Sequence, residues 1–460
     1  MNPMEELIVK AESGDIEAQF DLAEKYWEKE DYEQAFYWYK KAAEQGYAEA
    51  QCNLGVMYEN GRGIFQDYEQ AFYWSKQSAD QGNAEAQFNL ATMYYKDQGV
   101  LQDYEQAFYW YKQSADQEVA DAQCNLGLMY YEGQGVLQNY EQAFHWYKKS
   151  AEQGDAVAQC NLGLMYEKGQ GVLQDYEQAF YWYKQSADQG YAVALFNLGT
   201  MYYKGQGVLQ DYEQAFYWFK QSADQGDADA QCNLGLMYEK GQGVLQNYEQ
   251  AFHWYKKAAE QGDVVAQFEL GEMYYEQDYE QAFYWYKQSA DQGYVAAQCS
   301  LGFMYYEGEG VIQDYEQSFY WFKKSAEQGN ATAQFKLGLM YDRGEGVLQD
   351  YEQAFYWYKQ SAEQGGVGAQ FNLGKMHYEG QGVLQNYEQS FLWYKKAAEQ
   401  GYAEAQNNLG IMYEHGFGVK KNFKRAFDWY LKAKRNGSDR AEKALKNPIF
   451  DKIRIERLIK

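Results

Sequence analysis

The chain has 460 residues and a formal charge of −26, and it combines 46% apolar residues with only two prolines. The apolar content excludes a disordered acidic tail, and the negative charge argues against nucleic-acid binding, which requires Lys and Arg to neutralise phosphates. Apolar runs of only a few residues exclude a membrane-spanning helix, and residues 1–10 do not resemble a secretory signal. We therefore expect a cytoplasmic protein that binds neither a membrane nor a nucleic acid.

One short motif, Asp/Asn-Tyr-Glu-Gln-Ala/Ser-Phe, recurs from Asp31 onward and ends in a diverged copy at Asn422. Successive copies begin 36 residues apart, except for one step of 31 residues from Asn247 to Asp278. A fixed period of this length is typical of a solenoid. The spacing predicts an N-terminal half-repeat cap at 1–15, twelve repeats at 16–436 and basic capping helices at 437–460.

Each repeat reads as two helices, for example 48–59 and 68–79. Residues such as Asp31 are predicted to cap the second helix at its N-terminus, and Gly46 marks its end. Between the two helices, Gly-x-Gly loops such as 61–63 provide residues that tolerate positive φ. The 31-residue repeat lacks this loop, because Gln277 directly precedes the motif at Asp278.

Two repeated positions predict how the helices pack. The first helix carries an internal glycine in ten repeats, from Gly55 to Gly410. Since glycine costs a helix about 0.5–1 kcal/mol, a neighbouring helix must need the space, and we expect small residues such as Ala35 and Ala71 to be its partners. Tryptophan recurs once per repeat at the position of Trp38, which predicts contacts between neighbouring repeats.

The combination of A-x-A-Q-[FC]-N-L-G-x-M-Y, a Gly-x-Gly-Val loop, W-Y-K-x-[AS]-A and a closing glycine resembles the Sel-like repeat (SLR) family, a relative of the tetratricopeptide repeats. The resemblance implies an all-α fold, a right-handed α/α superhelical solenoid of about twelve antiparallel helix pairs with the first helices on its concave face. It also implies a protein-interaction scaffold or adaptor. Some bacterial members resemble immunity proteins that neutralise a cognate toxin, which is the second hypothesis.

Catalytic and metal motifs are missing from the sequence. No CxxC, HExxH or GxxxxGK[ST] pattern occurs, and almost every polar residue is copied from repeat to repeat. An active site requires different groups that converge at one place. We expect no enzyme activity, no cofactor, no metal and no small-molecule substrate; a hydrolase, the third hypothesis, would need a polar pocket in one repeat alone.

Partner choice is expected to depend on the positions that vary between repeats. On the first helix, positions such as Cys52, Val56 and Glu59 share one face, and we predict that this face binds an extended peptide or a helix. The alternative is that these side chains only contact the next first helix. The predicted partner-binding residues are apolar except for one lysine: Val56, Phe88, Leu128, Leu164, Phe196, Leu236, Phe303, Leu339, Lys375 and Ile411.

The distribution of charge along the chain indicates which class of partner to expect. Residues 420–460 hold 14 basic and 5 acidic residues, net +9, whereas the remainder holds 27 and 62, net −35. The acidic body favours a protein or peptide with a basic patch. Because Lys375 is the one basic residue on the predicted face, a clamp for a C-terminal carboxylate is disfavoured. A second candidate surface is the row of tyrosines on the second helices, such as Tyr181 and Tyr217.

Overall fold

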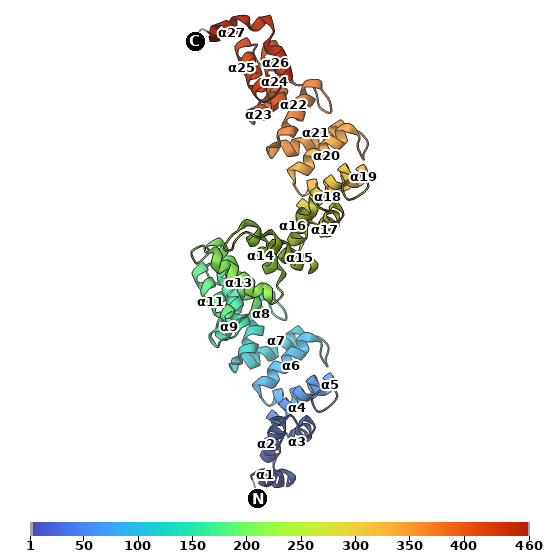
Figure 1. The fold of residues 1–460 in the computed structure, drawn as a ribbon. Coiled ribbons are helices and arrows are strands. Elements are labelled where there is room, and N and C mark those ends of the chain that lie inside the picture. The colour runs from blue at the N-terminus through green and yellow to red at the C-terminus, as the bar shows by residue number, and fades with distance from the viewer. Residues whose placement is uncertain (1–2, 459–460) are drawn as a thin grey trace. The chain divides into compact units, whose positions relative to one another are not determined.

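The computed structural model describes residues 3–458, with side chains to residue 455. Within these residues every regular element is a helix, as predicted. The chain divides into two compact units, Met1–Gln246 and Asn247–Lys460. Consecutive helices are paired within each unit, which is the local arrangement of an α-solenoid (Figure 1).

The first unit begins with α1 (Pro3–Glu12) and then alternates between first and second helices of the repeats. Its first helices are α2 (Ile16–Trp27), α4 (Ala48–Asn60), α6 (Ala84–Lys96), α8 (Ala120–Glu132), α10 (Ala156–Lys168), α12 (Ala192–Lys204) and α14 (Ala228–Lys240). Its second helices are α3 (Tyr32–Glu44), α5 (Tyr68–Asp80), α7 (Tyr104–Asp116), α9 (Tyr140–Glu152), α11 (Tyr176–Asp188) and α13 (Tyr212–Asp224).

The second unit continues the alternation. Its second helices are α15 (Tyr248–Glu260), α17 (Tyr279–Asp291), α19 (Tyr315–Glu327), α21 (Tyr351–Glu363), α23 (Tyr387–Glu399) and α25 (Phe423–Arg435). Its first helices are α16 (Val264–Tyr275), α18 (Val295–Glu307), α20 (Ala331–Arg343), α22 (Val367–Glu379) and α24 (Ala403–His415). After α25 follow α26 (Asp439–Leu445), the 3₁₀ helix η1 (Pro448–Phe450) and α27 (Asp451–Leu458).

The two helices of a repeat run antiparallel. At the start of α5 the amide of Asp67 donates to the carbonyl of Tyr58, near the end of α4, over 3.0 Å. At the other end of α5 the hydroxyl of Ser78 donates to the carbonyl of Ala48, in the first turn of α4, over 2.7 Å. The two contacts fix opposite ends of the pair, so the chain direction reverses between them.

The predicted helix signals are confirmed. The Asp31 side chain accepts a hydrogen bond from the amide of Gln34 over 3.2 Å, which caps α3. Gly46 has a φ of 96°, and Gly63 in the loop has a φ of 72°. A Cβ on Gly63 would also lie 2.1 Å from the carbonyl oxygen of Tyr32 in the preceding repeat. Only glycine therefore allows this loop to approach its neighbour so closely.

The glycines inside the first helices make room for an aromatic ring, which corrects the predicted partner. A Cβ on Gly163 would lie 2.7 Å from Cδ1 of Tyr183, on the second helix of the same repeat. The expected small residue is found only in part at Gly55, which lies close to the carbonyl of Ala71 but closest to Ser75, where other repeats carry a ring. The prediction that a neighbouring helix needs the space is correct, but the group that fills it is a ring.

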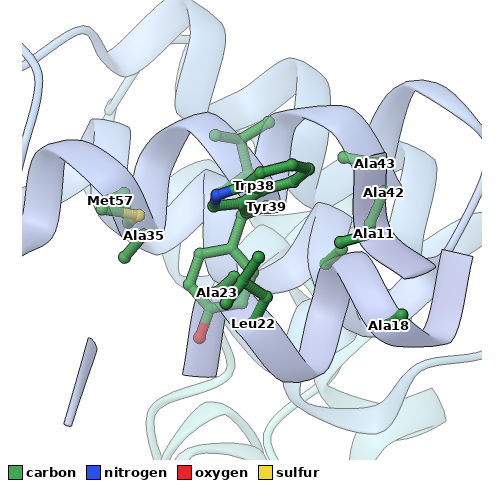
Figure 2. Close-up of a cluster of buried hydrophobic side chains, with 12 residues drawn as sticks. Ala11, Ala18, Leu22, Ala23, Ala35, Trp38, Tyr39, Ala42, Ala43 and Met57 are labelled. Atoms are coloured by element: carbon green, nitrogen blue, oxygen red, sulfur yellow. The ribbon is translucent and has the colours of Figure 1, made fainter. Parts of the chain in front are cut away.

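Tryptophan joins neighbouring repeats, as predicted. Trp146 on α9 is buried in one cluster with Tyr111 on α7 and with Leu126 and Met129 on α8. In the first repeat, Trp38 and Tyr39 lie together in a cluster that also contains Leu22 (Figure 2). A second helix thus contributes an aromatic ring to its own repeat and a tryptophan at the boundary between repeats, except that α5 has Ser75 at the position of the ring.

A buried glutamine adds a polar link between repeats. Gln123 on α8 donates to the carbonyl of Ala115 on α7 over 3.1 Å. The same side chain accepts a hydrogen bond from Gln153, at the end of α9, over 2.8 Å. One glutamine thus satisfies polar groups from two flanking helices, so its burial does not leave an unpaired amide.

Two kinds of feature are absent from the described residues. No helix within residues 3–458 has the length and apolar character needed to cross a membrane. Over the same part of the chain, no cluster of three or more His, Cys, Asp or Glu side chains has a geometry that could hold a metal ion.

Candidate partner-binding surface

The ten predicted partner-binding residues all lie on first helices, at the boundary between the core and solvent. The nine apolar ones are half-buried, and Lys375 is exposed. We call these positions, together with their equivalents in the other repeats, the first-helix stripe. The predicted alternative also holds in part, because Leu164 packs against a cluster that contains Leu198 of the next first helix. Each stripe side chain therefore gives one part of its surface to packing and leaves another part accessible.

The stripe is hollowed where two first helices meet above a second helix. A cavity of about 230 Å³ lies beside Glu24, Tyr39 and Val56 in the first unit. A second cavity of about 190 Å³ is lined by the equivalent residues Thr92, Tyr111 and Leu128, among others. The second unit holds a larger one, of about 390 Å³, whose equivalent residues are Lys375, Tyr394 and Ile411.

Tyr39 and its equivalents Tyr111 and Tyr394, on the second helices, form the floor of these hollows. The hydroxyl of Tyr183 donates to the carboxylate of Glu167 over 2.7 Å, and that of Tyr430 donates to Glu414 over the same distance. Burial raises the pKa of Tyr111 to about 12, while burial and the neighbouring Glu167 carboxylate raise the pKa of Tyr183 above its usual range. The hydroxyls consequently stay protonated, and those of Tyr183 and Tyr430 use their one proton in the hydrogen bond to the neighbouring carboxylate.

These floor tyrosines were not predicted as part of the surface, and the sequence marks only some of them: Tyr111 and Tyr394 have Tyr95 and Tyr378 at the position 16 residues earlier. Repeats with Tyr183 or Tyr430 carry an acidic residue 16 positions earlier, at Glu167 or Glu414. Where the ring is Phe219, the residue 16 positions earlier is Tyr203, which is not acidic. A half-buried carboxylate on this face is thus matched with a hydroxyl that can donate to it.

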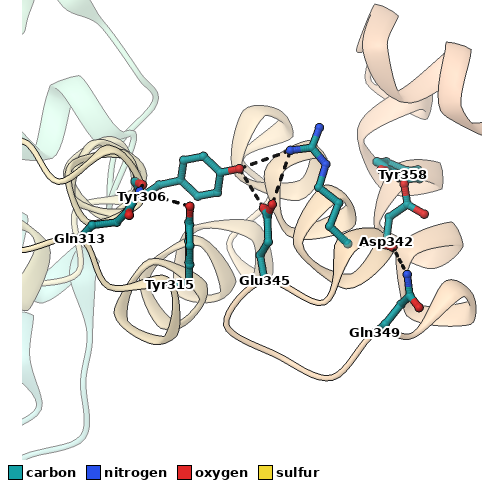
Figure 3. A network of polar contacts seen from close by, with 8 residues as sticks. Tyr306, Gln313, Tyr315, Asp342, Glu345, Gln349 and Tyr358 are labelled. Atoms are coloured by element: carbon teal, nitrogen blue, oxygen red, sulfur yellow. Dashed lines mark hydrogen bonds and ion pairs between the residues drawn. The ribbon is translucent and has the colours of Figure 1, made fainter.

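Other tyrosines on the first helices bind the next repeat and are used structurally. Figure 3 shows Tyr306 on α18, whose hydroxyl donates to Glu345 in the loop between α20 and α21 of the next repeat over 2.8 Å. Arg343 completes this group, with its guanidinium 3.7 Å from the same carboxylate. In the first unit, Tyr131 makes the equivalent bond to Gln170 over 2.9 Å. These side chains couple neighbouring repeats.

Two exposed rows lie outside the stripe. The predicted second-helix tyrosines Tyr181 and Tyr217 are each 50% exposed. The loops add a row that the sequence analysis did not single out, including Leu137 and Leu173, each 89% exposed. The recurring Val-Leu-Gln in the loops is the signal that could have identified this second row.

Comparisons with known proteins agree on one family. The Sel1 repeat model matches twelve consecutive segments between residues 16 and 438. A protective antigen present in uropathogenic Escherichia coli strains, whose crystal structure displays an SLR fold, shares 38% identity and a TM-score of 0.77, over 89% of this chain and 91% of that chain. A Sel1 repeat protein from Oxalobacter formigenes shares 33% identity and a TM-score of 0.51, over 66% and 90% of the two chains.

More distant comparisons add little. A Pseudomonas aeruginosa immunity protein shares 20% identity and a TM-score of 0.30, over 45% of this chain and 81% of that chain, and this likeness carries no argument about function. A search of curated proteins found no match.

Proposed function

The chain belongs to the Sel1 repeat family, and from this premise we propose that it is a non-enzymatic scaffold or adaptor that binds a partner protein or peptide on the first-helix stripe. Sel1 repeat proteins generally mediate protein–protein interaction. The observation that carries the proposal is the stripe itself, where accessible apolar side chains vary between repeats while the packing positions beneath them stay the same. Repeat proteins use extended surfaces of this kind for binding.

Charge supports a partner with a basic patch. Residues 1–419 carry 27 basic and 62 acidic residues, net −35. Complementary charge raises the rate of association and suppresses wrong partners, and salt screens it. We expect capture of the partner to weaken between about 50 mM and about 500 mM NaCl.

The proposal is tested by capture from native lysate followed by mass spectrometry. The variant Leu164→Glu with Leu236→Glu adds two charges to the stripe of the first unit, and we expect it to lose at least about 90% of the partner that the wild type captures. Buried or half-buried carboxylates in an interface carry a desolvation cost that an apolar contact does not. Circular dichroism checks that both proteins retain the same helical content.

A matched variant, Tyr181→Glu with Tyr217→Glu, adds the same charge to the exposed second-helix row. It should capture as much partner as the wild type does. Equal capture by the stripe variant, with loss of capture in the tyrosine variant, would move the binding surface to the second helices and reject the proposal.

A further inference from the structure

One hollow of the first-helix stripe differs from its equivalents in charge. At the first-helix position equivalent to Val56, these hollows are lined by Glu24 in the first repeat, Thr92 in the third and Lys375 in the eleventh. Lys375 is exposed, and its amine lies 3.9 Å from the carboxylate of Glu379, one turn later on the same helix. An exposed pair at this distance is weak, so the amine can exchange this partner for a better acceptor.

The fold brings a second cation to the same hollow. Arg440 belongs to α26, outside the repeat pattern, and it lines the cavity of about 390 Å³ together with Lys375. Its side chain is exposed and makes no hydrogen bond or ion pair with the described part of the chain. The hollow therefore contains two cationic side chains. Unlike a single lysine, this pair does not disfavour a carboxylate-binding site.

The remaining walls combine the Glu379 carboxylate, which faces the cavity beside Lys375, with neutral polar and apolar groups. Tyr394 forms the floor, and burial raises the pKa of its hydroxyl above the usual range, so that the group stays protonated beside the Asn408 amide. Phe371, Ile411 and Met412 supply apolar surface. Cavities of about 300–1,000 Å³ with mostly apolar walls and a few polar groups are typical of small-ligand sites.

We propose that this Lys375–Arg440 pocket binds a carboxylate attached to a short apolar side chain, as presented by the C-terminal residue of a peptide. Arg440 and Lys375 donate to the carboxylate, for which the planar guanidinium is well matched, and the side chain lies against Phe371 and Ile411. The inference rests on the proposed function, because the pocket is part of the first-helix stripe, and it specifies the chemistry of one end of the partner.

The test is a titration followed by the methyl NMR signals of Ile411 and Met412. The probes are N-acetyl-leucine, its uncharged counterpart N-acetyl-leucinamide, and N-acetyl-aspartic acid amide, which carries the carboxylate on a side chain. We expect N-acetyl-leucine to bind at least about tenfold more tightly than either of the others, since a charge-assisted hydrogen bond is stronger than a neutral one. Lys375→Gln and Arg440→Gln should each weaken its binding by about tenfold.

Lys359→Gln is the matched control, because Lys359 makes an equivalent exposed pair with Glu363 at 3.9 Å on α21, outside the pocket. It should leave binding unchanged. Equal affinity for the acid and the leucinamide, no shift with N-acetyl-leucine, or full binding by the Lys375→Gln, Arg440→Gln double variant would overturn the proposal. Tighter binding of the aspartic acid amide would reject a C-terminal ligand. Leu164 and Leu236 lie in the first unit, so failure here is distinguishable from failure of the capture experiment.

Discussion

Raising the pH from about 9 to about 12 should unfold the chain, with most of the loss of helix above about pH 10. Burial raises the pKa of Tyr111 to about 12 and lifts the pKa of other tyrosines at the equivalent position above their usual range, among them four that are as deeply buried as Tyr111. These four are Tyr147, Tyr183, Tyr358 and Tyr394. In the unfolded chain all five ionise near pH 10, so between that pH and their folded pKa values the folded state binds more protons.

This difference in proton binding sets the sign and the size of the change in the free energy of unfolding with pH. Stability is fully present below about pH 10 and falls as the pH rises through the folded pKa values, by about 1.4 kcal/mol per pH unit for each buried tyrosine. Tyr111, Tyr147 and Tyr183 lie in three consecutive repeats of the first unit and together give about 4 kcal/mol per pH unit, which is a large part of the stability of a typical domain. Circular dichroism and tyrosinate absorbance measure the two events together.

The five buried tyrosines should ionise together with the loss of helix. Retention of full helicity after all tyrosines have ionised would show that the floor hydroxyls are accessible to solvent and would contradict their burial.

Replacing one floor ring should destabilise the region around its repeat strongly. We expect Tyr183→Ala to lower the free energy of unfolding by about 3–5 kcal/mol, because the ring fills the space beside Gly163 and its removal leaves a cavity. Tyr183→Phe keeps the ring but removes the donor to Glu167, and should cost about 1–3 kcal/mol. Hydrogen exchange of the amides in α10 and α11 measures both effects locally, which suits a repeat protein whose unfolding need not be all-or-none.

The chain itself offers a control for the lost hydrogen bond. In the sixth repeat a ring without a hydroxyl, Phe219, faces Tyr203 where Glu167 stands in the fifth. Tyr183→Phe combined with Glu167→Tyr reproduces this pair and should recover most of the stability that Tyr183→Phe loses. A loss of less than about 1 kcal/mol in Tyr183→Ala would show that the ring does not support the repeat.

The helices could be predicted closely from local signals. The ranges 48–59 and 68–79 compare with Ala48–Asn60 and Tyr68–Asp80, because the Asp67 cap and the loop glycines mark the ends independently of tertiary contacts. The contact between repeats through tryptophan was also predictable, since a residue repeated once per repeat must meet the same surroundings each time.

The side chain that packs against the internal glycines was harder to predict. A glycine shows that space is needed, but the group that takes it depends on how the second helix is rotated about its axis. In the structure that rotation brings Tyr183, and not the nearby alanine position, over Gly163. Arg440 was inaccessible for a related reason, because α26 follows no repeat pattern and its position depends on packing against the last repeat.

The central claim is that partners bind the first-helix stripe, and side-chain oxidation footprinting of the complex with the captured partner tests it most directly. We expect Leu164 and Leu236 to be protected in the complex, while Tyr181, Tyr217 and the loop residue Leu173 keep the reactivity that they have in the free protein. Protection confined to Tyr181 and Tyr217, with Leu164 and Leu236 unchanged, would contradict the claim.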